Sequence, residues 1–184
     1  MEIILASSSP RRKELLKRMG YDFTVDVSEV DETCALIPKE AVKELASRKA
    51  RAVASRHDKG LIIASDTLVS LDDTALGKPI DKNDAYKMLR ALSGRTHAVY
   101  SGVCMIDAAT GREISEVAGS FVTFRDVSDE EINKYIATGE PMDKAGAYAI
   151  QGGAGAFVEK LEGSFENVMG FPVDLVKKML SQFE

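Results

Sequence analysis

The stretch Ile3-Ile4-Leu5-Ala6-Ser7-Ser8-Ser9-Pro10-Arg11-Arg12 sets the fold class of this chain. Its four apolar residues predict a short buried strand, and the serines that follow predict a tight turn. Ser9 can cap a helix and Pro10 suits its first position, so we expect a helix that runs to Met19 and stops at Gly20. A strand that passes directly into a helix is typical of an α/β fold.

The alternation of strands and helices continues to the end of the chain. The apolar patterns predict further strands over 21–27, 61–71, 99–106, 113–124, 147–150 and 157–161. Further helices are expected to open at Pro38, Asp81, Ser128 and Pro172. The early units are strand–helix–strand, whereas the turn at 107–111 makes an antiparallel hairpin. We therefore expect one domain over residues 1–184, with a mixed central β-sheet flanked by helices.

Composition limits the chemistry that is open to this protein. The 184 residues contain 24 Lys and Arg against 29 Asp and Glu, a net charge of −5, with only two His and two Cys. These counts exclude a zinc cage of Cys and His, a disulfide framework and a basic coat for nucleic acid. Neither a signal peptide nor an apolar run of about 18 residues is present, so we expect a cytoplasmic protein without a membrane segment. An enzyme of this composition must rely on carboxylates, lysines and arginines.

The first twenty residues carry a local positive charge. They hold five basic side chains against two acidic ones. Arg11 and Arg12 fall in the first turn of the predicted helix, where cations oppose the helix dipole. Two arginines there make sense if a phosphate binds at the helix N-terminus together with Ser7. A capped helix with solvated arginines remains the alternative.

Asp66 lies inside the apolar segment 61–71. A carboxylate in such a strand has to be paired, ligate a metal or lie at a cleft, because burying it alone is costly. A structural aspartate is the alternative. The nucleophile motif of haloacid dehalogenase phosphatases is excluded, since it needs a second Asp where this chain has Leu68.

Three further positions are candidates for nucleotide binding. Lys78 lies in Gly77-Lys78-Pro79 and Lys49 on the Pro38 helix, and each could hold a phosphate or simply face solvent. Gln151 lies in the glycine-rich stretch 138–155, which matches neither a P-loop nor a dinucleotide-binding fingerprint. Its amide could bind the edge of a base, or the stretch could be an ordinary loop.

The order of these motifs resembles the Maf family of nucleoside triphosphate pyrophosphatases, once described as septum-formation inhibitors. The resemblance covers about residues 5–172 and is carried by a series of short motifs. They are Ser7-x-Ser9-Pro10-Arg11-Arg12, Asp31-Glu32, Lys49, Ser65-Asp66-Thr67, Gly77-Lys78-Pro79, Ser93-Gly94-x-x-His97 and Gly139-Glu140-Pro141-x-Asp143-Lys144-Ala145-Gly146-Ala147-Tyr148-x-Ile150-Gln151-Gly152. Met169-Gly170-Phe171-Pro172 departs from relatives that have Leu before the proline, a conservative change.

The resemblance implies a fold and a reaction. The fold is that of the Maf and inosine triphosphatase-like proteins, a mixed sheet in two lobes with an intervening cleft, usually in a homodimer. The reaction is hydrolysis between the α- and β-phosphates of a nucleoside triphosphate. Asp66 aligns with the family's proton acceptor, and Arg11, Thr67 and Gln151 match the specificity positions of the dTTP/UTP branch.

The residues suit that chemistry, because phosphoryl transfer depends mainly on positioning and charge neutralisation. Ser7, Arg11, Arg12, Lys49 and Lys78 can hold triphosphate oxygens. Glu32 and Asp66 can ligate Mg²⁺ or Mn²⁺, and whether Asp66 is mainly base or ligand stays open. No stable nucleic-acid partner is expected. The alternatives are the same chemistry on another nucleotide, such as 7-methyl-GTP, or a non-catalytic nucleotide- or nucleic-acid-binding regulator of septum formation.

Overall fold

The computed structural model describes residues 2–183. Its strands are β1 (Ile3–Leu5), β2 (Phe23–Val25), β3 (Leu61–Leu71), β4 (Thr74–Leu76), β5 (Thr96–Asp107), β6 (Glu113–Phe124) and β7 (Val158–Glu162). Its α-helices are α1 (Pro10–Arg18), α2 (Pro38–Ala54), α3 (Lys82–Leu92), α4 (Asp129–Ala137), α5 (Phe165–Met169) and α6 (Val173–Leu180). Three short 3₁₀ helices lie between α4 and β7: η1 (Glu140–Asp143), η2 (Ala145–Ala147) and η3 (Gly153–Phe157).

The strands form one mixed seven-stranded sheet in the order β2-β1-β3-β5-β6-β7, with β4 paired to β3. Strand β1 is parallel to both β2 and β3, whereas β3, β5, β6 and β7 are antiparallel in succession. The predicted fold class, a mixed sheet flanked by helices, is thereby confirmed. The predicted hairpin of β5 and β6 is confirmed as well.

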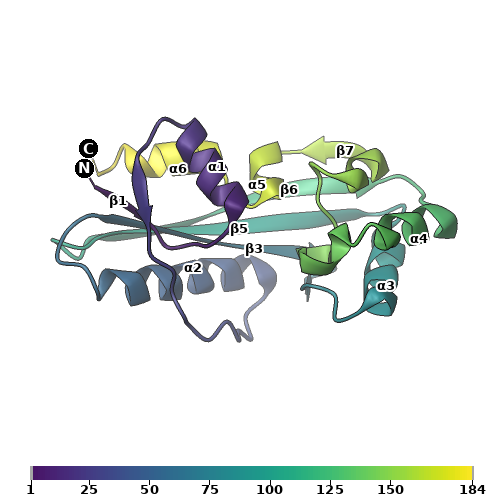
Figure 1. The fold of residues 1–184 in the computed structure, drawn as a ribbon, viewed down its shortest axis with the longest axis horizontal. Helices are drawn as coiled ribbons and strands as arrows, with labels where there is room; N and C mark the ends of the chain where they lie inside the picture. The colour runs from purple at the N-terminus through teal and green to yellow at the C-terminus, as the bar shows by residue number, and fades with distance from the viewer. Residues whose placement is uncertain (1, 184) are drawn as a thin grey trace.

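Both faces of the sheet are covered at the end where the chain begins and finishes. Helices α1 and α6 lie over one face and α2 over the opposite face, and the two chain ends lie close together there (Figure 1). Alternate side chains of β1 and β3 point to opposite faces of the sheet. Ile3 and Leu61 pack with α1 and α6, while Ile4 and Ile62 pack with α2. This double burial explains why these strands read as continuous apolar runs.

The other end of the molecule has a core of its own. Helices α3 and α4 pack there with the 3₁₀ segment, β7 and the far ends of β3, β5 and β6 (Figure 1). The long strands β3 and β5 therefore run through two lobes, as the resemblance implied. Helix α4 begins with the predicted capping box of Ser128 and Glu131, and α3 with the predicted cap Asp81.

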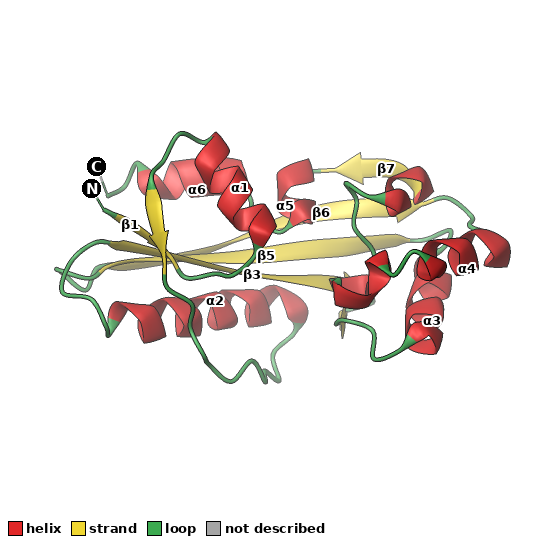
Figure 2. Ribbon diagram, in the orientation of Figure 1, coloured by secondary structure: helices red, strands yellow, loops and turns green. Residues whose placement is uncertain are grey.

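The predicted strand at 147–150 is wrong. Gly146 and Ala147 have φ angles of 69° and 63°, so the chain turns through η2 where a strand would extend. Figure 2 shows this segment as short helical turns joined by loops. Besides the 3₁₀ helices, one strand and one α-helix were not predicted. Strand β4 follows a tight turn in which Asp72 and Asp73 both have positive φ, and α5 has only five residues, too few for a helical period.

Two further properties follow from residues 2–183. None of their helices is both long and apolar enough to cross a membrane. Cys34 and Cys104 are both free cysteines, of which Cys104 is buried in the sheet.

Candidate active site

A cleft of about 930 Å³ lies between the two lobes and is lined by residues from both. This volume is in the range of small-molecule sites. Every site residue that the sequence suggested lines it, although they come from six separate segments. They are Ser7, Arg11, Arg12, Glu32, Lys49, Asp66, Thr67, Lys78 and Gln151.

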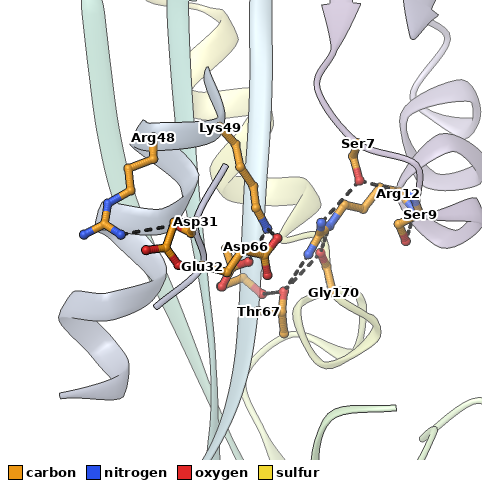
Figure 3. Close-up of polar contacts among 11 residues, drawn as sticks. Ser7, Ser9, Arg12, Asp31, Glu32, Arg48, Lys49, Asp66, Thr67 and Gly170 are labelled. Atoms are coloured by element: carbon orange, nitrogen blue, oxygen red, sulfur yellow. Dashed lines mark hydrogen bonds and ion pairs between the residues drawn. The ribbon is translucent and has the colours of Figure 1, made fainter. Parts of the chain in front are cut away.

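Lys49 joins two carboxylates on one wall of the cleft. Its Nζ lies 2.6 Å from Oδ1 of Asp66 and 3.0 Å from Oε1 of Glu32. Lys49 comes from α2 and Asp66 from β3, and their side chains are only 12% and 10% exposed, whereas that of Glu32 is 62% exposed. Figure 3 shows the three side chains converging. Lys49 therefore does not belong to a solvated basic face, and Asp66 is both paired and at a cleft, two of the three settings expected for it.

The N-terminus of α1 forms the facing wall. Ser9 caps the helix by accepting a hydrogen bond from the backbone N–H of Arg12, and the first turn has no acidic residue. The Arg12 side chain donates to Ser7 Oγ at 3.3 Å and to Thr67 Oγ1 at 3.3 Å (Figure 3). Burial lowers the pKa of the Arg12 guanidinium, the nearby positive charge of Arg11 adds to this, and the negative charges of Asp66 and Glu32 oppose it. An anion at this helix terminus would relieve that cost.

The remaining predicted residues lie towards the second lobe. Thr67 follows Asp66 in β3, and its Oγ1 lies 2.8 Å from Ser101 Oγ. Lys78 and Gln151 are both exposed. The loop that carries Gln151 is braced on its two sides, since Tyr135 Oη accepts from the N–H of Ala149 and the Glu140 carboxylate accepts from the N–H of Gly153.

Three residues that line the cleft, Asp143, Lys144 and Tyr148, were quoted from the sequence only as part of a motif and were given no role. Lys144 is paired with Asp143 at 2.5 Å and only 15% exposed, and Tyr148 lies nearby in the same lining. Their position inside the glycine-rich stretch was the available signal. Tyr148 Oη lies 2.6 Å from Nε2 of His97, which is buried and does not line the cleft. Burial raises the pKa of Tyr148 and lowers the pKa of His97 to about 4.

The donor set fits a divalent cation that is shared with a nucleotide. Glu32 and Asp66 lie around the same ammonium group, so two carboxylates already converge. Within residues 2–183, His, Cys, Asp and Glu side chains nowhere gather in threes as a metal cage. Mg²⁺ commonly binds through one or two carboxylates and completes its coordination with waters and phosphate oxygens. The cleft can therefore hold a hard ion together with phosphates, and is poorly suited to one held by protein alone.

Comparison with known proteins shows the family of this chain. A family model described as Maf-like protein matches residues 2–183. The chain belongs to the Maf-like family. A dTTP/UTP pyrophosphatase of Thermococcus gammatolerans is 51% identical to this Maf-like chain over 177 residues, which cover 96% of the chain and 94% of the relative.

Two further relatives of this Maf-like chain carry the same name. The dTTP/UTP pyrophosphatase of Bdellovibrio bacteriovorus is 46% identical over 189 residues, covering 98% of both chains. That of Pelotomaculum thermopropionicum is 48% identical over 184 residues, covering 99% of this chain and 96% of the relative. The likeness thus extends over both lobes and the cleft between them.

Proposed function

We propose that this Maf-like chain is a nucleoside triphosphate pyrophosphatase, a hydrolase that converts dTTP and UTP to the monophosphate and pyrophosphate. One observation carries the proposal. A helix N-terminus with two arginines faces a lysine that joins two carboxylates, in one cleft of nucleotide size. The relatives named dTTP/UTP pyrophosphatase, at 46–51% identity over nearly the whole chain, support the choice of substrate.

In the proposed reaction, water attacks the α-phosphorus and the bond from that phosphorus to the bridging oxygen breaks. Pyrophosphate then leaves with the electron pair of that bond. Asp66 takes the proton of the attacking water, and Lys49, 2.6 Å away, stabilises its carboxylate and the charge on the phosphates. Ser7, Arg11, Arg12 and Lys78 hold triphosphate oxygens, for which guanidinium groups have the matching fork geometry.

Glu32 and Asp66 would hold the divalent cation. When bound, Mg²⁺ or Mn²⁺ neutralises phosphate charge and promotes ionisation of water. Asp66 then serves as a ligand as well as the proton acceptor. Removing the cation with a chelator should abolish pyrophosphate release, and added Mg²⁺ should restore it; undiminished release in excess chelator would contradict the metal requirement.

Base recognition is assigned to the second-lobe side of the cleft. Gln151 offers both an amide donor and an amide acceptor, which suits the N3–H and O4 of uracil or thymine. Thr67 and Arg11 complete the proposed specificity set. The proposal also includes a cytoplasmic homodimer without a stable nucleic-acid partner, and light scattering of the purified chain tests the dimer.

A panel of nucleotides with separate detection of pyrophosphate and orthophosphate tests the function. With Mg²⁺, dTTP and UTP should give pyrophosphate as the first product and the highest kcat/KM, because discrimination is expressed in that ratio. The panel should include 7-methyl-GTP, dCTP and GTP. Orthophosphate as the first product would contradict the proposed bond cleavage, and a higher kcat/KM for another base would contradict the substrate.

A further inference from the structure

Helix α5 ends against the two arginines of the cleft. The carbonyl of Met169 accepts a hydrogen bond from Nε of Arg11 at 3.1 Å, and that of Gly170 accepts one from Nε of Arg12 at 2.9 Å. Gly170 makes this possible, because its φ of 109° is left-handed and turns the chain at the helix end. Nε holds each guanidinium in place, and each terminal nitrogen of Arg12 donates one N–H, to Ser7 or to Thr67. The second N–H of each terminal nitrogen can then bind a phosphate oxygen.

These carbonyls can orient the arginines only if α5 itself is fixed. Asn167, within α5, is completely buried. Its Nδ2 donates to the carbonyl of Val99 in β5 and to Oγ of Ser120 in β6, both at 3.0 Å. Since the Val99 carbonyl only accepts, it determines which end of the Asn167 amide points to the sheet.

Two buried serines complete the attachment of α5 to the sheet. Ser120 Oγ accepts from the N–H of Ser164 and donates to its carbonyl, each at 3.1 Å, which fixes the first turn of α5. Ser101 Oγ donates to the carbonyl of Asn167 at 3.3 Å and lies 2.8 Å from Thr67 Oγ1. The polar groups beneath α5 thus connect it directly to the floor of the cleft.

We propose that Asn167 is a positioning residue for triphosphate binding. It anchors α5 to β5 and β6, so that the carbonyls of Met169 and Gly170 hold Arg11 and Arg12 in the orientation that receives phosphate oxygens. This rests on the proposed function for the identity of the ligand. A purely structural role would lower stability without moving either guanidinium.

Nuclear magnetic resonance of the arginine Nε–H groups tests the positioning directly, without substrate. The variant is Asn167→Leu, which has similar volume and no donor. We expect the Nε–H signals of Arg11 and Arg12 to shift and to exchange faster with solvent. Arg125 is an internal control, because its Nε donates to the carbonyl of Ala156 at 2.9 Å in the other lobe. Ser120→Ala, which removes one acceptor of Asn167, serves as a second variant should Asn167→Leu not fold.

Kinetics with dTTP and Mg²⁺ provide the second readout. Both variants should raise KM, about tenfold for Asn167→Leu, with little change in kcat, because the arginines hold the phosphates before and during the reaction. In an Arg12→Lys background the effect of Asn167→Leu on KM should shrink, as expected for residues that act through one another. Ser128→Ala, which removes the cap of α4 in the other lobe, should lower stability and leave KM unchanged.

The outcomes separate the two proposals. Unmoved Nε–H signals of Arg11 and Arg12 in a folded variant, or an unchanged KM, would overturn the role of Asn167. A wild-type protein that releases no pyrophosphate would contradict the proposed function instead, and the resonance experiment would still decide the positioning.

Discussion

The side chains of the cleft are held before any substrate binds. Lys49 spans from α2 to a carboxylate in β3 and a second one in the exposed segment before α2. The Lys49 ammonium thus lies between two carboxylates, which compensates for the loss of water around its buried side chain. The positive charge that a triphosphate needs is concentrated on a few side chains of the cleft, although the whole chain has a net charge of −5.

Replacing Asp66 by Asn should remove most of the activity. The amide keeps the shape of the side chain and cannot take a proton, so kcat should fall by about 10²–10⁴-fold, the usual contribution of a general base. Pyrophosphate release from dTTP measures this, and circular dichroism checks the fold. Asp143→Asn is a matched control, because it also removes a carboxylate of the cleft that is paired with a lysine. A variant within threefold of the wild type would refute the role of Asp66.

His97 should make stability depend on pH. Its pKa is about 4 in the folded chain because of burial, against about 6.5 when unfolded. The unfolded chain therefore takes up the proton first, and the contribution of His97 to stability is lost as pH falls from about 6.5 towards 4. At pH 5 the loss relative to pH 8 is about 2 kcal/mol.

Urea unfolding at the two pH values checks this, with His97→Gln as the comparison. The variant should lose about 2 kcal/mol less between pH 8 and pH 5 than the wild type does. Tyr148→Phe removes the hydroxyl that contacts His97 and leaves the imidazole buried, so it should keep most of the wild-type drop. An equal drop in wild type and His97→Gln would show that another group is responsible.

At the scale of elements, the sequence predicted those helices and strands whose own residues contain a clear signal, such as a cap or an apolar pattern. Ser9 with Pro10, Ser128 with Glu131, and the apolar run of β3 each determined a boundary or a face. Prediction was wrong at Ala147, because its positive φ is one that alanine rarely adopts and that the sequence does not signal. The nine candidate residues could be named from motifs, whereas the carbonyls of Met169 and Gly170 leave no trace in a side-chain pattern.

The contact between α2 and the sheet is tight at one glycine. Gly102 of β5 pairs with Asp66 of β3, and an added Cβ would lie 2.1 Å from the carbonyl oxygen of Val42 in α2. Gly102→Ala should therefore push α2 away from the sheet and cost about 3 kcal/mol. Because α2 carries Lys49, kcat/KM should fall as well.

Urea unfolding and pyrophosphate release measure the two effects. Gly119→Ala in the neighbouring strand β6 is the matched control, since its Cβ would meet only the movable ring of Tyr100, at 3.1 Å. It should cost less than about 1 kcal/mol. Equal stability of Gly102→Ala and wild type would show that α2 can move without cost.

At the scale of the whole molecule, two cores share the long strands β3 and β5, and the cleft lies between them. A ligand that contacts both lobes stabilises both. At a concentration of 100 Kd it should add about 2.7 kcal/mol, which raises Tm by about 5–10 °C for a chain of this size.

Thermal unfolding with a dTTP analogue that cannot be cleaved between the α- and β-phosphates tests this. The increase in Tm should require Mg²⁺, and thymidine, which lacks phosphates, should give a much smaller one at the same concentration. If thymidine alone gave the full increase in Tm, the binding energy would come from the base. That result would contradict the proposed role of Arg11 and Arg12 in binding phosphates.

The two chain ends lie close together at the end of the sheet that helices cover on both faces (Figure 1). This proximity makes a circular permutation of the protein possible. A short flexible linker can join α6 to β1, and new ends can be opened in the exposed turn at 109–111. Circular permutation is tolerated when the new ends lie in a surface turn and the original ends lie close together. The rearranged chain would begin at β6 and finish at β5, with every residue of the cleft uncut. It should fold and release pyrophosphate at a rate close to that of the natural order, which would show that the cleft depends on how the segments pack and not on the order in which they are joined.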